Sequence, residues 1–278
     1  MYLHDNDALF EGVLARASQS LGVDIELLEK DYYVTMLLRE ISKRIPYSVF
    51  KGGTSLSKCY QIIDRFSEDV DLGFSQKLTG SERKSVKYEL LNITQSLGME
   101  LLNPGDLRSR RDYNAYMLRY RTKRPILGVR VDSVVKLETY IGTISYPTIA
   151  MPVCSVLTDY LMSENEMHAI EEFSLAPFSM TLQSLERTFI DKIFALCDYY
   201  LREEDRRNSR HLYDIYKLMP KVTFDASLKA LAESVRVERC QLSVCPSALE
   251  GVDVVRLLCE ITESDFYKRD YESLTTAL

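Results

Sequence analysis

The chain contains 278 residues, of which 46% are hydrophobic and 27% are charged, and its formal net charge is −6. This length and composition allow one large core or two smaller ones and exclude a disordered or fibrous protein. Charged residues interrupt every long apolar run, so we expect no membrane segment and a cytoplasmic location. The acidic balance argues against a protein that coats nucleic acid, but a local basic patch is compatible with it.

The six cysteines form no close pair such as C-x-x-C, and the chain has only three histidines. This spacing predicts neither a zinc site nor a disulfide framework. We expect ordinary reduced thiols.

Helices are predicted for the first 45 residues. The first helix begins after Asp and Asn capping candidates and ends at Gly22, and Asp24 precedes the second helix. Apolar residues recur there near helical spacing and predict one buried face: Leu27, Leu28, Val34, Leu37, Leu38 and Ile41. A short strand, "YSVF" (47–50), then runs into a glycine pair.

A helix is predicted after these glycines, followed by a strand at "DVDLGF" (69–74) and a polar helix at 81–98. Two longer strands follow, at 113–121 and 126–142, and from Ser184 onward the pattern is helical. We therefore expect an α+β fold. Residues 1–176 would form a lobe with a small mixed β-sheet flanked by helices, and residues 177–278 a helical C-terminal lobe, with the boundary near Pro177.

The glycine pair, Gly52 and Gly53, lies between a predicted strand and a predicted helix. Glycine lets the backbone turn tightly and approach a ligand closely. The following helix, capped by Thr54 or Ser55, would point free N–H groups at the turn, where a phosphate fits.

Asp69 and Asp71 are two residues apart on the next strand, so both carboxylates lie on one face. Two such acids repel each other unless a cation lies between them, and Mg²⁺ bridged to substrate phosphates suits hard oxygen ligands. A phosphate turn beside an acid pair is typical of nucleotidyl transfer. Either pattern alone is common, whereas their order along the chain is far more specific.

The stretch "KGGTSLSKCYQIIDRFSEDVDL" (51–72) resembles the signature of the DNA polymerase β-type nucleotidyltransferase superfamily, and more narrowly of the AbiEii (MenT-like) toxins of type IV toxin–antitoxin systems. "LEKDYYVTMLL" (28–38), "LERTFIDKIFAL" (185–196) and "RHLYDIYKL" (210–218) resemble further motifs of that family. The resemblance extends over about residues 28–218, and the last sixty residues contribute nothing to it.

The resemblance implies roles for two residues of the helical part. Lys192 matches the motif lysine, which would contact nucleotide phosphates, and Asp214 matches the C-terminal acid. Without the resemblance, a solvated lysine and a surface aspartate are the ordinary interpretations. "VKLET" resembles a family strand and favours Glu138 over Asp132 as a third acid, although a surface strand with ordinary charges remains an alternative.

In this interpretation Asp69, Asp71 and Glu138 hold Mg²⁺ at the α-phosphate of an NTP. The turn formed by Gly52, Gly53, Thr54 and Ser55 holds the β- and γ-phosphates, and Lys192 neutralises charge there. An acceptor hydroxyl attacks in line and releases pyrophosphate.

The segment Asp106–Arg124 carries seven basic and two acidic residues, interleaved with tyrosines. Arg119 and Arg121 share a strand face, where guanidinium groups would bind phosphate while Tyr113, Tyr116 and Tyr120 stack on unpaired bases. A charged strand with buried tyrosines is the alternative, because aromatic and basic residues also mix on ordinary sheets. Arg210 is a further candidate for RNA contact. The resemblance implies the 3′ end of tRNA as acceptor, which would block translation as in a toxin or phage-defence system, and it implies a cognate antitoxin.

Two alternatives remain open: a nucleotidyltransferase acting on a small-molecule or protein hydroxyl, or a non-catalytic module that binds RNA or the antitoxin. Intact Asp69 and Asp71 argue against the second. Ser67 lies two residues before Asp69, so its phosphorylation would add negative charge beside the acid pair. We expect it to be a regulatory residue through which an antitoxin silences the enzyme.

Overall fold

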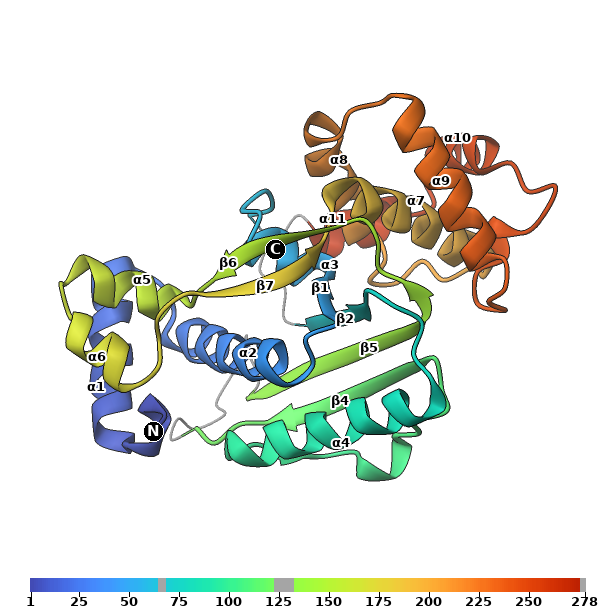
Figure 1. Ribbon diagram of the computed structural model, residues 1–278. Helices are drawn as coiled ribbons and strands as arrows, with labels where there is room; N and C mark the ends of the chain where they lie inside the picture. Colours follow the sequence, from blue (N-terminus) through green and yellow to red (C-terminus); the bar gives the residue numbers. More distant parts are fainter. Residues whose placement is uncertain (65–68, 123–132, 276–278) are drawn as a thin grey trace. The chain divides into compact units, whose positions relative to one another are not determined.

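The computed structural model describes residues 1–64, 69–122 and 133–275 (Figure 1). The strands in these ranges form a seven-stranded mixed sheet. The strand order is β3-β4-β5-β2-β1-β7-β6. β1 pairs with β7 in parallel, whereas β4 pairs antiparallel with both β3 and β5. The mixed α+β architecture is therefore confirmed. The strands are β1 Ser48–Lys51, β2 Asp69–Phe74, β3 Glu100–Leu101, β4 Tyr113–Arg119, β5 Val134–Ile144, β6 Thr148–Val153 and β7 Phe178–Gln183.

Helices precede, interrupt and follow the strands, and within the described ranges no strand follows Gln183, as expected for a helical C-terminal part. The helices are α1 Asp7–Leu21, α2 Ile25–Arg44, α3 Gly52–Lys58, α4 Gly80–Ser96, α5 Val156–Ser163, α6 Met167–Glu172, α7 Leu185–Leu201, α8 Arg210–Leu218, α9 Ala226–Arg239, α10 Val254–Glu263 and α11 Lys268–Ser273. A short 3₁₀ helix, η4, spans Pro246–Ala248. None of the helices described here is long and apolar enough to cross a membrane.

The chain forms two compact units that interleave along the sequence. Unit 1 consists of Met1–Phe50, Glu68–Ile141 and Ala150–Leu182, and unit 2 consists of Lys51–Ser67, Gly142–Ile149 and Gln183–Leu278. The two units are defined by the density of contacts within each of them. The division into independent domains at Pro177 stays a prediction.

Helix α2 differs from its prediction. The apolar pattern predicts one buried face, yet nearly all residues from Leu28 to Ile41 are buried, including the charged Glu29, Lys30, Arg39 and Glu40. Helices α1, α4 and α5 all contact α2, so neighbours cover several of its sides. Long side chains bury their apolar stems in such a position, which a pattern based on apolar residues alone does not detect.

The ends of α1 and α3 test the predicted caps. Asn6 caps α1 by accepting a hydrogen bond from the Leu9 amide at 3.1 Å, and Gly22 ends it with φ 65°. The predicted cap of α3 is wrong: this helix begins at Gly52, and Lys51 occupies the capping position without a side-chain cap. The helix begins earlier than predicted because Gly52, with φ 75°, already makes the turn that was expected to end at Thr54.

All six cysteines are free thiols in the structure.

Candidate functional site

Asp69 and Asp71 begin strand β2 and alternate with buried apolar residues. Val70 and Leu72 are fully buried, whereas both aspartates are half-buried. This alternation confirms that the two carboxylates share a face of the strand. β5 is the neighbour of β2 in the sheet, and it carries Glu138.

Glu138 is nearly buried, with 7% of the residue exposed, and its carboxylate accepts several hydrogen bonds. Oε1 receives the Lys136 ammonium at 2.6 Å and the Tyr113 hydroxyl, and Oε2 receives the Tyr140 hydroxyl at 3.1 Å. Burial acts to raise the pKa of Glu138, but the Lys136 ammonium and the Tyr113 hydroxyl, which donate to its carboxylate, outweigh burial and lower the pKa below its ordinary value. Glu138 is therefore held as an anion beside Asp71.

The three carboxylates also change the pKa values of neighbouring side chains. Burial acts to lower the pKa of Lys136, but Glu138, Asp69 and Asp71 raise it above its ordinary value. Burial raises the pKa of Tyr113, and the same three carboxylates raise it further. We call Asp69, Asp71, Glu138, Lys136, Tyr113 and Tyr140 the acid cluster, which lies entirely in unit 1.

The acid cluster has donors suited to Mg²⁺. Carboxylate oxygens are the ligands that this ion prefers, and it commonly takes only one or two carboxylates together with substrate phosphates and water. Within the described ranges, however, no three Asp, Glu, His or Cys side chains converge closely enough to hold a metal. Asp69 and Asp71 therefore fit a metal shared with a substrate rather than a closed protein site.

The glycine turn lies in unit 2. Ser55 is fully buried, and its hydroxyl donates to the Gly52 carbonyl at 2.8 Å. Thr54 is also buried, at 5% exposure. The side chains of the G-G-T-S segment therefore stabilise the turn, and any contact of this segment with a ligand would come from its backbone.

Lys192 and Asp214 form a buried ion pair in unit 2. Lys192 Nζ lies 2.6 Å from Asp214 Oδ2, and the two residues are 7% and 0% exposed. Helix α7 carries Lys192, and α8 carries Asp214. Leu56 of α3 packs in the same apolar cluster as Phe189 and Ile190 of α7. Unit 2 thus brings together three parts of the predicted site: the glycine turn, Lys192 and Asp214.

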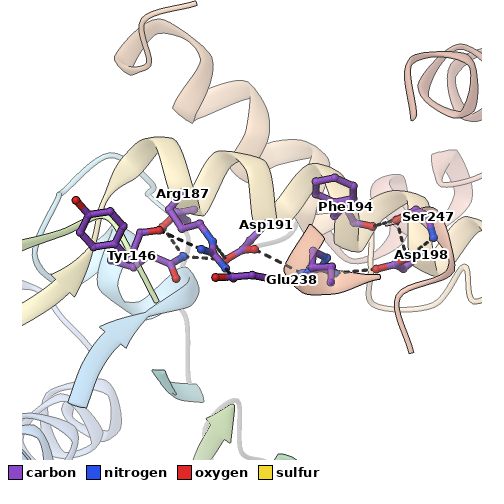
Figure 2. Close-up of polar contacts among 10 residues, drawn as sticks. Tyr146, Arg187, Asp191, Phe194, Asp198, Glu238 and Ser247 are labelled. Carbon is purple, nitrogen blue, oxygen red and sulfur yellow. Dashed lines mark hydrogen bonds and ion pairs between the residues drawn. The ribbon is translucent and has the colours of Figure 1, made fainter. Parts of the chain in front are cut away.

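A second set of charged residues lies along α7 (Figure 2). Arg187 Nε lies 3.2 Å from Asp191 Oδ2, and Arg187 also contacts Glu238 at 3.1 Å and the Tyr146 carbonyl at 3.0 Å. Burial acts to raise the pKa of Asp191, but the charges of Arg187, Lys51 and Arg239 lower it. Since Lys51 precedes the glycine turn and Asp191 precedes Lys192, this electrostatic contact links the two motifs.

Arg239 extends this set along α7. Its guanidinium lies 3.5 Å from Asp191 and 2.7 Å from Asp198, and Asp198 accepts hydrogen bonds from the Ser247 amide at 2.8 Å and hydroxyl at 2.6 Å. Figure 2 shows Asp198 and Ser247 beside the Phe194 carbonyl, to which Ser247 also donates. We call Arg187, Asp191, Asp198, Glu238, Arg239 and Ser247 the α7 charge network.

The basic segment is only partly as predicted. Arg119 and Arg121 are exposed and lie beside Glu100 at 3.4 Å and Asp7 at 3.7 Å. Tyr116 and Tyr120 are buried, at 2% and 3% exposure, so the expected base stacking by these tyrosines is wrong. They alternate toward the core, and burial raises the pKa of Tyr116 to about 12.

Aromatic packing keeps Tyr120 in the core: its ring stacks on the ring of Tyr33 in α2, with 4.4 Å between the ring centroids. Tyr113, by contrast, is 43% exposed. Arg210 begins α8, where it is half-buried, and the ring of the next residue, His211, stacks on Tyr199.

Two predicted candidates, Ser67 and Asp132, lie outside the described residues. Lys136, Tyr113 and Tyr140 were not predicted as site residues. Alternation along β5 does place Lys136 and Tyr140 on the face of Glu138. The register that sets Tyr113 opposite Tyr140 is a property of the folded sheet.

Comparisons with known proteins identify the family of the chain. The family model described as nucleotidyl transferase AbiEii toxin of type IV toxin–antitoxin systems matches residues 37–275. The match thus reaches nearly to the end of the chain, which corrects the expectation that the last sixty residues lie outside the resemblance. No curated protein matches the chain.

Two solved structures are similar. MenT4, a nucleotidyltransferase toxin from Mycobacterium tuberculosis, matches with a TM-score of 0.50 and 16% identity, covering 92% of this chain and 88% of its own. An antigenic nucleotidyltransferase-like protein from Paracoccidioides brasiliensis matches with a TM-score of 0.40 and 16% identity, covering 79% and 93%. At such identity the first likeness shows the fold. From the family match, the chain belongs to the AbiEii nucleotidyl transferase toxins of type IV toxin–antitoxin systems.

Proposed function

We propose that this toxin transfers NMP from an NTP to the 3′ end of tRNA in a Mg²⁺-dependent reaction that blocks translation. The observation that carries the proposal is Asp69 and Asp71 on one face of β2, with Glu138 beside Asp71, in a chain of a nucleotidyltransferase family. Carboxylates on a rigid strand hold a metal at a reacting phosphate with little reorganisation.

Each residue has a separate proposed role. Asp69 and Asp71 would hold Mg²⁺, and the ion would supply electrostatic stabilisation of the charge that develops on the reacting phosphate. The backbone of Gly52 and Gly53 approaches the β- and γ-phosphates closely, and Lys192 neutralises their charge. Asp214 keeps the Lys192 ammonium in place through the contact of 2.6 Å. The acceptor hydroxyl then gives its proton to one of the carboxylates and forms a bond to the α-phosphorus, while the bond from the α-phosphorus to pyrophosphate breaks and pyrophosphate leaves.

The tRNA acceptor is supported by the family and by the exposed guanidinium groups of Arg119 and Arg121. Their acidic neighbours are exposed as well, and such surface pairs contribute only about 0–1 kcal/mol, so phosphates replace them easily. Arg210 is a weaker candidate for the same contact. A type IV system also implies a cognate antitoxin and, for this toxin, a cytoplasmic target.

The test is incubation of the purified protein with total tRNA, Mg²⁺ and each α-³²P-labelled NTP in turn. Label should enter tRNA with the wild type and with the control Asp106→Ala, which removes an exposed acid, but not with Asp69→Ala or Lys192→Ala. Labelling that is unchanged without Mg²⁺ would contradict the metal-dependent mechanism.

A small-molecule or protein acceptor predicts a different result. In that case tRNA stays unlabelled while the enzyme still binds NTP, and Arg119→Ala with Arg121→Ala leaves the activity unchanged. A chain that binds neither NTP nor Mg²⁺ would instead be a non-catalytic module.

A further inference from the structure

Lys136 is placed on the acid-cluster face by the strand itself. Residues 136, 138 and 140 alternate onto one face of β5, and the register sets Tyr113 of β4 opposite Tyr140. The two tyrosine rings lie 5.2 Å apart, and both hydroxyls donate to Glu138. A cross-strand aromatic pair thus holds the carboxylate that binds Lys136.

Glu138 is well suited to anchor a cation. An ionised carboxylate has about four lone-pair sites, and Tyr113, Tyr140 and Lys136 use three of them. The side chains of Lys136 and Glu138 are 37% and 9% exposed. An ordinary surface ion pair has two exposed and mobile partners, whereas here the acid is fixed and only the lysine reaches solvent.

The surroundings explain why a cation is needed there. Asp69 and Asp71 both act electrostatically on Lys136. A substrate phosphate that approaches three carboxylates is repelled, and an ammonium among them offsets that repulsion. Lysine binds phosphate as a point charge and has three N–H donors, of which the contact with Glu138 uses one.

We propose that Lys136 is a substrate-binding residue whose ammonium, held by Glu138 beside Asp69 and Asp71, donates to a phosphate group. The proposal rests on the nucleotidyl-transfer function given above. The phosphate belongs either to the nucleotide triphosphate or to the terminal phosphodiester of the RNA acceptor, because both present the same anionic oxygens.

The experiment compares Lys136→Met, which keeps most of the side-chain length, with Lys136→Arg and with the control Lys84→Met on an exposed position of α4. Three affinities are measured for the full chain: for Mn²⁺ alone by electron paramagnetic resonance, for a non-hydrolysable NTP analogue with Mg²⁺, and for tRNA. Thermal unfolding confirms that each variant is folded.

Lys136→Met should weaken the binding of one phosphate ligand by about tenfold or more, as expected for a lost charged hydrogen bond. Weaker NTP binding assigns Lys136 to the triphosphate, and weaker tRNA binding assigns it to the acceptor. Mn²⁺ should bind Lys136→Met at least as tightly as the wild type, because a positive neighbour has been removed. Lys136→Arg should keep most of the phosphate affinity, and Lys84→Met all of it.

Unchanged affinity of Lys136→Met for both phosphate ligands would overturn the proposal and leave the nucleotidyltransferase function intact. Wild-type protein that binds neither ligand would overturn both. If Lys136→Met does not fold, Tyr113→Phe provides the second variant. It keeps all charges but loosens Glu138, and it should weaken the same ligand by a smaller factor; no change with this folded variant would count against the anchoring role.

Discussion

The acid cluster and the α7 charge network arrange their charges in opposite ways. In the acid cluster three carboxylates lie on neighbouring strands, and the Lys136 ammonium interacts with all three. In the α7 charge network, arginines alternate with carboxylates: Arg187 lies between Asp191 and Glu238, and Arg239 between Asp191 and Asp198. Like charges held together are costly, whereas alternating ones stabilise each other.

This difference suggests separate roles: the acid cluster is suited to bind a ligand, and the α7 charge network is suited to stabilise the fold. Groups that repel each other persist in a fold when a ligand compensates them, so such groups gather at functional sites. A network in which each charge lies beside an opposite charge needs no ligand to compensate it. We therefore expect changes in the acid cluster to affect activity more than stability, and changes in the α7 charge network to do the reverse.

The largest expected effect concerns Asp69. Asp69→Asn removes a ligand of the proposed Mg²⁺ ion while keeping the side-chain shape. The proposed transfer of label to tRNA should then fall by roughly a thousandfold, since metal stabilisation of the transition state amounts to several kcal/mol. The unfolding temperature should stay the same or rise, because one of the repelling charges is gone. Single-turnover labelling and thermal unfolding measure the two quantities. A large loss of stability would show that the acid cluster is structural.

The next effect concerns the buried pair of Lys192 and Asp214. Asp214→Leu leaves a buried ammonium without its partner, and the free energy of unfolding should fall by about 3–5 kcal/mol in urea denaturation. The double variant Asp214→Leu with Lys192→Met should regain most of this stability but remain inactive. Regained activity in the double variant would contradict the role of Lys192.

Arg239 tests the expected structural role of the α7 charge network. Arg239→Met leaves Asp198 buried with fewer donors, so the free energy of unfolding should fall by about 2–3 kcal/mol. Folded Arg239→Met protein should retain the nucleotide affinity of the wild type. A selective loss of nucleotide binding without loss of stability would show that the network acts in catalysis.

The pH dependence of stability gives a smaller effect. The folded-state pKa of Asp191 is lowered, so its contribution is complete above the unfolded value of about 3.9 and is lost as the pH falls through the folded value. Asp191→Asn should therefore lose stability at pH 7 and show a flatter acid limb. Urea denaturation between pH 7 and pH 3 measures this, and a parallel shift at all pH values would contradict the assignment.

The smallest expected effect is that of Ser247→Ala. This change removes the hydroxyl that donates to Asp198 at 2.6 Å, while the backbone amide of residue 247 still donates. The cost should be about 1 kcal/mol in unfolding free energy, typical of one buried hydrogen bond with a remaining donor. Activity per folded molecule should be unchanged.

The sequence predicts local features of the site well. Strand β2 has the predicted bounds 69–74, because its apolar residues alternate strictly with the aspartates. Strands β6 and β7 were not predicted. β6 contains Pro152, which weakens a strand pattern, and β7 gains its place by pairing with β1, which lies far earlier in the chain. Such a partner is not visible in a local window.

Contacts between residues that lie far apart in the sequence could not be predicted from local patterns. The family resemblance selects Lys192 and Asp214 separately, but only the packing of α7 on α8 shows that they pair. Likewise, alternation places Lys136 and Glu138 on one face, whereas the Tyr113 contact depends on the register of β4 and β5. The roles of Tyr116 and Tyr120 failed for the related reason that a basic, aromatic strand has two faces, and the tyrosines take the inner one.

The interleaving of the two units has a consequence for synthesis of the chain. The chain passes between the units after residues 50, 67, 141, 149 and 182, so residues 51–67 emerge from the ribosome long before the helices of their own unit. The apolar cluster of Leu56 cannot form until Phe189 and Ile190 have been synthesised. The apolar packing of α3 is therefore completed only late in translation, and a nascent or truncated toxin that ends before α7 lacks these partners of Leu56.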